Sequence, residues 1–451
     1  MREKHAIVIG ASLGGLCAAR VLANFHHRVT VYDRDLLPET PGHRAAVPQS
    51  RHVHLLMARG AMEFEKLFPG LLDDMVAAGV PVLENRPDCI HFGAAGHVLG
   101  THHRLQDEFT AYVPSRVHLE WQIRRRVSAL PNVTLVHGDV DEPIFDGRTV
   151  TGVRTADGAT VDADLVIDAT GRGTRLPVWL EQWDFRRPEE NTVDVGISYA
   201  TQQLRIPEGL VAEKVVVAGA SRDQPLGLGM LHYEDGTWGL TTFGVAKVKP
   251  PKDFAEMCAL ADEILPVHLA VAVRRSEPLG DIALHKYPTS RWRRFDKIAE
   301  YPRGILPFGD AVVSFNPTFG QGMTMTSLQA GHLRKALLTP DPEATFLKAT
   351  AKTTYPVWTM NAIGDLTMHG ATGKAPRWYG PVGALFDQFL GAAETDPVLA
   401  EWFLRRFSLL DSLWMVPSAR LVGRTVRHNM TLWVRSRRSP GTAASVPAQR
   451  V

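Results

Sequence analysis

The segment that most constrains the fold lies near the start of the chain, where a short apolar run leads into a glycine-rich turn. Residues 6–9 (Ala-Ile-Val-Ile) predict a buried strand, and residues 16–24, rich in alanine and leucine, predict a helix. Between them stands Gly-Ala-Ser-Leu-Gly-Gly at 10–15. Residues 28–33 alternate in polarity as a second strand does, and they end on an acid. The order strand, turn, helix, strand predicts a βαβ unit and therefore an α/β fold.

A turn of this kind suits the pyrophosphate of a dinucleotide. Glycines let the chain reverse tightly and let its backbone approach the phosphates, and the helix N-terminus offers free N–H groups and a positive dipole end. Asp33 follows Gly10 by 23 positions, close to the spacing of about 20 expected for the acid that binds a ribose hydroxyl. A carboxylate there disfavours a 2′-phosphate, which predicts FAD or NAD rather than NADP. The nucleotide-binding candidates are Gly10, Ser12, Leu13, Gly14, Gly15, Asp33 and Arg34.

The same residues also fit the G-x-S-x-G nucleophile elbow of serine hydrolases, with Ser12 as the nucleophile. In a hydrolase that elbow follows several strands and needs an oxyanion loop upstream. Only nine residues precede Gly10, so the chain has no room for that loop. We therefore favour phosphate binding.

Composition excludes several other classes of protein. Of 451 residues, 45% are hydrophobic and 22% are charged, which is typical of a globular chain and excludes a disordered or fibrous one. The formal net charge of +2 gives no support to nucleic-acid binding, whose signature is a basic surplus. Three scattered cysteines fit neither a disulfide framework nor a metal site, and they favour a reducing, cytoplasmic setting. We expect neither a signal peptide nor a transmembrane span, because no apolar run is long enough.

Patterns farther along the chain predict two interleaved domains and a helical end. Alternating polarity between 190 and 290 indicates an antiparallel sheet, and a βα pattern returns at 303–337. Helices are expected at 53–68 and 115–129. The expected boundaries are 1–85, 110–185 and 295–340 for a Rossmann-type nucleotide-binding domain, 86–109 and 186–294 for a sheet-rich substrate domain, 341–438 for C-terminal helices, and 439–451 for a disordered tail.

A second constellation lies near residue 310. Residues 304–311 predict a strand that ends on Gly-Asp, and a proline and a Gly-Gln-Gly follow before a helix. Here the sequence resembles the FAD-dependent monooxygenases of the para-hydroxybenzoate hydroxylase superfamily, and the resemblance covers most of residues 1–337. The matching residues are Asp310, Pro317, Gly320, Gln321 and Gly322. The resemblance implies that Asp310 accepts hydrogen bonds from ribityl hydroxyls and that the helix start brings N–H groups and a positive dipole end to the flavin.

The resemblance implies further FAD contacts. Arg116, in a helix with Ser115 and Glu120, resembles the residue of the family that faces the cofactor. Arg51 resembles the basic loop that borders the flavin, and Val140 stands where the family places a main-chain contact to adenine. Pro317, Gly320, Gly322 and Met323 complete the expected cofactor-binding set. The sequence predicts no metal ligand and identifies no catalytic side chain.

The activity that the resemblance implies is insertion of one oxygen atom from O2 into a small hydrophobic substrate, through a flavin C4a-hydroperoxide, with reducing equivalents from NAD(P)H. The middle motif of the family departs from its usual form, because residues 168–177 read Asp-Ala-Thr-Gly-Arg-Gly-Thr-Arg-Leu-Pro. Thr170 and Pro177 stand where the family has an acid and an arginine tied to NAD(P)H, and Thr174 replaces a serine. This departure favours a separate flavin reductase as electron donor over direct use of NAD(P)H.

The subtype rests on two short runs. The Ala-Thr-Gly of the middle motif and Ser-Phe-Asn-Pro at 314–317 resemble the flavin epoxidases of polyether ionophore biosynthesis and, more distantly, squalene epoxidase. We therefore expect epoxidation of an alkene in secondary metabolism. Hydroxylation of an aromatic ring is the first alternative, and flavin-dependent reduction of a polyprenyl chain is the second.

Residues 401–438 hold eight arginines and two acids, interleaved with apolar residues. We favour a packed helix with a solvated basic face. The alternative is a basic amphipathic helix that contacts an anionic membrane surface.

Overall fold

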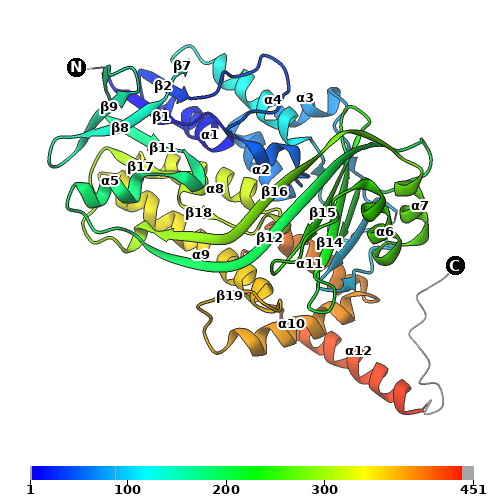
Figure 1. Cartoon of the computed structure of the whole chain (residues 1–451). Coiled ribbons are helices and arrows are strands. Elements are labelled where there is room, and N and C mark those ends of the chain that lie inside the picture. The colour runs from blue at the N-terminus through cyan, green and yellow to red at the C-terminus, as the bar shows by residue number, and fades with distance from the viewer. Residues whose placement is uncertain (1–2, 87, 439–451) are drawn as a thin grey trace. The chain divides into compact units, whose positions relative to one another are not determined.

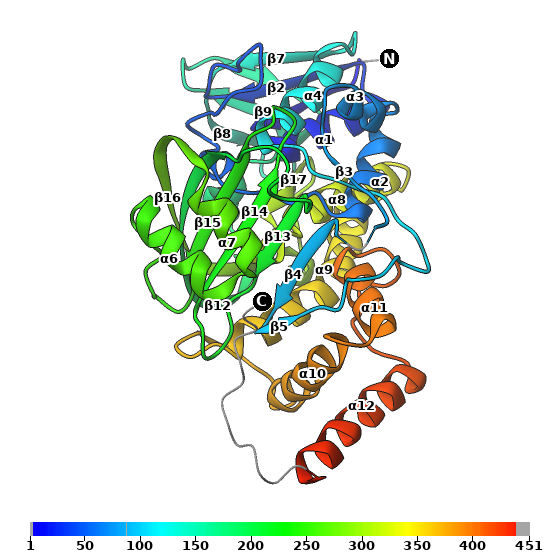
Figure 2. The ribbon, with the colours of Figure 1, turned by 90° about the vertical axis from the view of Figure 1, so that its right-hand side faces the viewer.

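The structure is a computed structural model that describes residues 3–86 and 88–438, with side chains up to Val434. The predicted disordered tail at 439–451 therefore lies outside the described residues. The chain divides into two compact units, each made of three segments. Unit 1 comprises residues 1–80, 114–194 and 289–361, and unit 2 comprises residues 81–113, 195–288 and 362–451. Figures 1 and 2 show the elements of both units.

Unit 1 is built on a five-stranded sheet with the order β17-β11-β1-β2-β7. All of its strands are parallel, and Val8 of the central strand pairs with Ile167 on one side and Val31 on the other. The strands are β1 (His5–Ile9), β2 (Arg28–Asp33), β7 (Val133–His137), β11 (Leu165–Asp168) and β17 (Ile305–Pro307). Every residue of β1 is buried, as an apolar run at the centre of a covered parallel sheet requires. This sheet confirms the predicted α/β fold with a Rossmann-like nucleotide-binding unit.

Helices cover the parallel sheet of unit 1. Helix α1 (Leu13–Leu22) contacts β1, β2 and β11 and lies beside α4 (Arg116–Ser128) and α8 (Gly322–Ala336). The remaining elements of this unit include α2 (Ala58–Leu67), α3 (Leu71–Ala77), α5 (Leu176–Gln182) and a three-stranded antiparallel sheet of β8 (Val140–Phe145), β9 (Val150–Thr155) and β10 (Thr160–Asp162). Helix α9 (Pro342–Leu366) belongs to unit 1 as far as Asn361.

The predicted helix at 53–68 is wrong over its first turn, because α2 begins only at Ala58. The preceding residues run past the start of α8, where a Cβ built on Gly320 would meet Met57 at 2.9 Å and Leu55 at 3.8 Å. This tertiary packing takes the place of the helical turn that the apolar spacing suggested.

Unit 2 is rich in sheet, as predicted. Its strands follow the order β12-β15-β14-β13-β4-β5, with antiparallel neighbours except for the parallel pair β13 and β4. Strands β12 (Glu189–Arg205) and β16 (Glu277–Arg294) run from one unit into the other. The other strands are β3 (Val82–Leu83), β4 (Ile90–Ala94), β5 (His97–Val98), β6 (Ala111–Tyr112), β13 (Val215–Ala218), β14 (Leu226–His232), β15 (Trp238–Gly244) and β19 (Thr372–Gly373).

Two apolar clusters hold the helices of unit 2. Helices α6 (Phe254–Ile264) and α7 (Val267–Arg274) pack on the sheet through Met257, Leu269 and Leu240. Helices α10 (Tyr379–Ala393), α11 (Pro397–Phe407) and α12 (Ala419–Arg438) share the second cluster with β4. Within the described ranges, no helix combines the length and the apolarity that crossing a bilayer needs.

Candidate functional site

The glycine turn of unit 1 needs its glycines for steric reasons. Gly10 has φ of 101°, and a Cβ there would lie 2.7 Å from the carbonyl oxygen of Ala169. A Cβ on Gly15 would lie 1.7 Å from the carbonyl oxygen of Gly10. At Gly14 the nearest atom, in the ring of Phe308, would be at 3.7 Å. Gly10 and Gly15 therefore allow a tight turn, and α1 begins next to the C-terminal end of β1.

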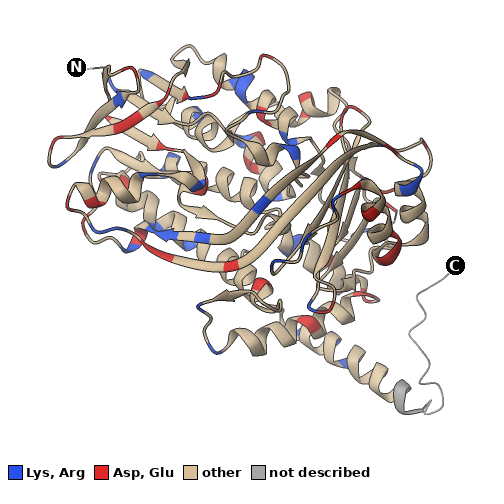
Figure 3. Cartoon of the chain, in the orientation of Figure 1, with Lys and Arg blue, Asp and Glu red and all other residues tan. Residues whose placement is uncertain are grey.

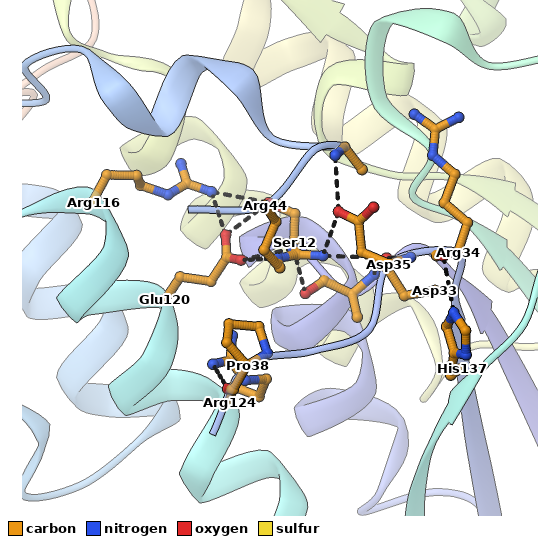
Figure 4. A network of polar contacts seen from close by, with 12 residues as sticks. Ser12, Asp33, Arg34, Asp35, Pro38, Arg44, Arg116, Glu120, Arg124 and His137 are labelled. Carbon is orange, nitrogen blue, oxygen red and sulfur yellow. Dashed lines mark hydrogen bonds and ion pairs between the residues drawn. The ribbon is translucent and has the colours of Figure 1, made fainter. Parts of the chain in front are cut away.

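Asp33 ends β2 beside this turn, as predicted from its spacing. Its Oδ2 accepts from the backbone N–H of Ala11 at 2.6 Å, and its Oδ1 accepts from the N–H of Asp35 at 2.9 Å. Arg34 is exposed, and its carbonyl oxygen is 3.2 Å from Nε2 of His137 (Figure 4). Val140 begins β8 shortly after β7 ends opposite Asp33. These residues lie at one end of the parallel sheet, where a ribose and an adenine would follow the pyrophosphate.

A buried arginine that the sequence did not single out, Arg44, joins Asp33 to helix α4. Its guanidinium donates to Oδ1 of Asp33 at 3.2 Å and, through Nη2, to Oε1 of Glu120 at 2.7 Å (Figure 4). The charges of Glu120 and Asp33 outweigh the opposing effect of burial and raise the pKa of Arg44. Arg44 comes from the loop before the 3₁₀ turn at Pro48–Arg51, so its partners are 11 and 76 positions away in the sequence.

Arg116 places a second guanidinium at the start of α1. It begins α4, and its Nη2 donates to Oγ of Ser12 at 2.9 Å and to Oε2 of Glu120 at 2.8 Å. Burial opposes ionisation of Glu120, but the charges of Arg116 and Arg44 prevail and lower the pKa of its carboxyl. The Nε of Arg116 is buried and has no hydrogen-bond partner among the described residues. Arg116, which the resemblance implies to face the cofactor, thus carries an unused donor next to the glycine turn.

Asp310 lies near Arg116 although the two residues are far apart in sequence. It stands in the 3₁₀ turn Gly309–Ala311 that follows β17, and the guanidiniums of Arg172, Arg116 and Arg293 act on its carboxyl. Burial raises the pKa of Asp310 in spite of these three charges. Within the part of the chain that the structure describes, its carboxylate has no hydrogen-bond or ion-pair partner. A half-buried carboxylate of this kind can accept hydrogen bonds from water or from a ligand.

The start of α8 is also built as the sequence predicted. Gly320, with φ of 66°, ends the 3₁₀ turn Pro317–Phe319, and α8 begins at Gly322 with Met323 next to it. Gln321 is fixed by Asn361, whose amide nitrogen donates to Oε1 of Gln321 at 2.9 Å. A Cβ on Gly322 would meet no atom within 4 Å, so open space lies beside the first residue of this helix. Helix α8 lies beside α1, and the positive ends of both helices belong to unit 1.

The loop between Arg44 and α2 supplies one more side chain near Arg116. Arg51 itself is exposed, and among the described residues it makes no side-chain hydrogen bond or ion pair, although its charge acts on His43. His54 is more enclosed: its Nδ1 lies 2.8 Å from the carbonyl oxygen of His52. Burial, aided by the charge of Arg116, lowers the pKa of His54 to about 3. His54 is therefore a neutral imidazole whose Nδ1–H donates to His52 and whose Nε2 is an acceptor.

In the middle motif, residues 168–177, which departs from the family's usual sequence, the polar side chains hydrogen-bond to one another. Asp168 is fully buried, and it accepts from the N–H of Thr170 at 3.0 Å, from the Thr170 hydroxyl at 2.5 Å and from the Thr174 hydroxyl. Arg172 donates to Oγ of Ser314 at 2.6 Å. Thr170 and Thr174 thus satisfy Asp168 within the protein. No group of three or more His, Cys, Asp or Glu side chains in the described chain could hold a metal ion.

Two family models match parts of the chain. Residues 373–439 match the model described as "Mycobacterium Rv3254 C-terminal domain", and residues 109–208 match the model described as "Glucose inhibited division protein A". The first match begins at β19 and covers α10 to α12 of unit 2.

Relatives that match most of the chain were also found. The chain is 65% identical to "Protein Rv3254" of Mycobacterium tuberculosis over 99% of its own length and 98% of the relative. It is 26% identical to "Kynurenine 3-monooxygenase" of Salinispora arenicola over 71% of this chain and 70% of that protein. The solved p-nitrophenol 4-monooxygenase of Pseudomonas putida matches with a TM-score of 0.64 and 18% identity, over 91% of this chain and 98% of that chain. These comparisons confirm the predicted fold and the predicted enzyme class, FAD-dependent monooxygenase, and they do not specify epoxidation.

Proposed function

This chain belongs to the family of Protein Rv3254 of Mycobacterium tuberculosis, and we propose that unit 1 binds FAD and that the enzyme uses it to insert one oxygen atom into a small hydrophobic alkene. The adenosine end of FAD would lie at Asp33, the pyrophosphate at the Gly10 turn beside Arg116, and the ribityl chain at Asp310. The flavin ring would then reach the N-terminal end of α8. When bound, FAD supplies the activation of O2.

The unpartnered carboxylate of Asp310 is the observation that carries this proposal. The charge of Arg116 acts on it, and Nε of Arg116 has no hydrogen-bond partner among the described residues, so one acceptor and one donor lie near each other in unit 1. A ribityl hydroxyl can donate to the carboxylate, and a phosphate oxygen can accept from the guanidinium. FAD is a cofactor that offers both groups along one chain.

The proposed reaction is balanced by an external reductant. One oxygen atom of O2 enters the alkene as an epoxide, and the other leaves as water after taking up two electrons and two protons. Thr170 and Thr174 bind Asp168 rather than standing free, which supports a separate flavin reductase as the electron source. A cytoplasmic location is part of the proposal, in keeping with three free cysteines at Cys17, Cys89 and Cys258.

Aromatic hydroxylation is the second candidate. It is favoured by the similarity to the kynurenine 3-monooxygenase and by the shared fold of the p-nitrophenol 4-monooxygenase. Reduction of a polyprenyl chain is the third candidate, and it would consume no O2. Product analysis under ¹⁸O2 with candidate alkenes and phenols separates the first two, and O2 consumption separates both from the third.

FAD binding itself is tested with Asp310→Ala. We expect FAD affinity to fall roughly ten- to a hundredfold, because a hydrogen bond to a charged group contributes about 1.5–3 kcal/mol. Asp223→Ala, which removes an exposed aspartate from unit 2, is the matched control and should keep wild-type affinity. Fluorescence titration of FAD into apoprotein gives both numbers. Unchanged affinity in Asp310→Ala would count against the site.

The electron source is tested by stopped-flow. Oxidised enzyme is mixed with substrate and NADPH or NADH in the absence of O2, and the flavin absorbance is followed. We expect negligible bleaching until a flavin reductase is added. Rapid bleaching without the reductase would show that the enzyme uses NAD(P)H directly.

A further inference from the structure

Helix α12 presents three different faces along its length. The first face packs inside unit 2, where Leu421 and Thr425 are buried and Nε of Arg424 donates to Asp396 at 2.8 Å. This face lies against α10, and Asn429 donates to the side chain of Gln388 from the same side. Figure 2 shows α12 running beside α10. The other two faces carry exposed side chains.

The second face is an exposed apolar stripe. Val422, Val426, Met430 and Trp433 follow one another at spacings of four, four and three, which puts them on one side of a helix. Their exposed fractions are 46%, 51%, 61% and 54%. Single exposed apolar residues are ordinary on protein surfaces, but an aligned series over three turns is the pattern of a helix that docks.

The third face is basic. Arg420 and Arg427 are exposed beside the apolar stripe, and among the described residues neither has an ion-pair partner. Over the described chain as a whole, acidic and basic residues are interspersed (Figure 3). The sequence from 412 to 451 differs, because it holds seven arginines and no aspartate or glutamate. This segment combines an apolar stripe with neighbouring arginines and has no acidic residues. It is therefore complementary to a surface whose outer layer is anionic and whose interior is apolar.

We propose that α12 docks on an anionic phospholipid surface, with the apolar stripe inserted at the level of the acyl chains and Arg420 and Arg427 at the phosphates. Interfacial helices combine these same features, and they lie in the plane of the membrane without crossing it. A second copy of the chain is a poorer occupant. A symmetric pair would bring two acid-free, arginine-rich segments together, and like charges across an interface are unfavourable.

The test is co-sedimentation of the full-length, FAD-loaded protein with vesicles. One set of vesicles is phosphatidylcholine, and the other contains about one third phosphatidylglycerol. We expect binding to the anionic vesicles only, and its loss in about 1 M salt, where the Debye length falls to about 3 Å. Equal binding to both sets, or none to the anionic set, would overturn the proposal.

Variants assign the binding to α12. Met430→Asp should weaken vesicle binding by more than roughly tenfold, because it places a charge in the inserted stripe. Arg420→Gln with Arg427→Gln should weaken it roughly 10- to 30-fold, since each basic residue near such a surface contributes about fivefold. The matched controls are exposed residues of unit 1 at the end of α8, Leu338→Asp, and Arg334→Gln with Lys335→Gln, and they should bind as wild type.

Two further measurements distinguish a loss of vesicle binding from misfolding and from dimerisation. Circular dichroism shows whether each variant is folded, and light scattering gives the oligomeric state without vesicles. Folded stripe variants that bind anionic vesicles as tightly as wild type would refute the lipid assignment. A dimer that Met430→Asp converts to a monomer would refute it too, because the stripe would then be covered by a second copy.

Discussion

Replacing Gly15 by alanine tests the steric reasoning about the glycine turn at residues 10–15. The added Cβ would lie 1.7 Å from the carbonyl oxygen of Gly10 and 3.2 Å from Cγ1 of Val8. The first contact is with backbone, so no side-chain rotation relieves it, and α1 must move away from β1. Overpacking of a core typically costs about 1–3 kcal/mol, and a clash with backbone this close belongs at the upper end, about 3 kcal/mol.

The neighbouring glycine provides the control. A Cβ on Gly14 would meet the ring of Phe308 at 3.7 Å, an ordinary van der Waals distance. Gly14→Ala should therefore leave stability within about 1 kcal/mol of wild type, because it also gains the helix propensity of alanine. Both variants add one methyl group to the same turn of α1, and only its direction differs.

The assay is thermal unfolding of the FAD-free protein, since bound cofactor would stabilise the native state and mask the difference. At about 2–4 °C per kcal/mol, Gly15→Ala should melt roughly 6–12 °C below wild type, and Gly14→Ala within roughly 4 °C of it. FAD titration should show greatly weakened binding in Gly15→Ala. Equal melting temperatures for the two alanine variants would refute the argument, because the direction of the methyl group would then not matter.

Three further predictions concern the polar network. Glu120→Gln should destabilise the protein by about 3–5 kcal/mol at pH 7, since it leaves two guanidiniums partly unpaired. Because the folded pKa of Glu120 is lowered, its stabilising effect is present above its ordinary pKa and is lost as the pH falls through the folded value, so the melting temperatures of variant and wild type should converge at acidic pH. Ser12→Ala should keep FAD binding within a few fold and keep activity, because backbone N–H groups bind the phosphates; a variant that binds FAD normally but is inactive would revive the nucleophile hypothesis. Thr174→Val should lower stability by about 1–3 kcal/mol by removing a donor from buried Asp168, as measured by urea unfolding; an unchanged midpoint would show that the contact is not important.

The sequence predicted the parts of the site that depend on local spacing. Gly10 and Asp33 belong to one βαβ unit, so their distance along the chain determines their proximity in space. Arg44 was not predicted, because it lies in a loop without periodicity and its partner Glu120 is 76 positions away. The sequence shows that Arg44 is basic and precedes Arg51, but it does not predict the path of the loop that brings Arg44 to Glu120.

The nearness of Arg116 to Asp310 could not be predicted either. Each residue was a candidate through its own motif, but their proximity follows from the packing of α1 beside α4 and α8, which lie in three different segments of unit 1. The late start of α2 has the same origin. The apolar spacing favours a helix from residue 53, but the residues before Ala58 pack beside Gly320 and are not helical.

Because unit 1 is made of three chain segments, it cannot complete its fold until late in synthesis on the ribosome. Asp33 leaves the ribosome early, but Asp310 is made 277 residues later, which at about 5–20 residues per second is a delay of roughly 15–55 s. Until Ile305–Pro307 arrives, β11 has one open edge, because its partner on that side is β17. A nascent chain in this interval carries an apolar parallel strand with unpaired backbone groups, the kind of surface that chaperones recognise and that aggregates when left alone. In the proposed FAD site, Asp310 follows β17 directly, so the complete set of cofactor contacts would exist only after this edge has closed.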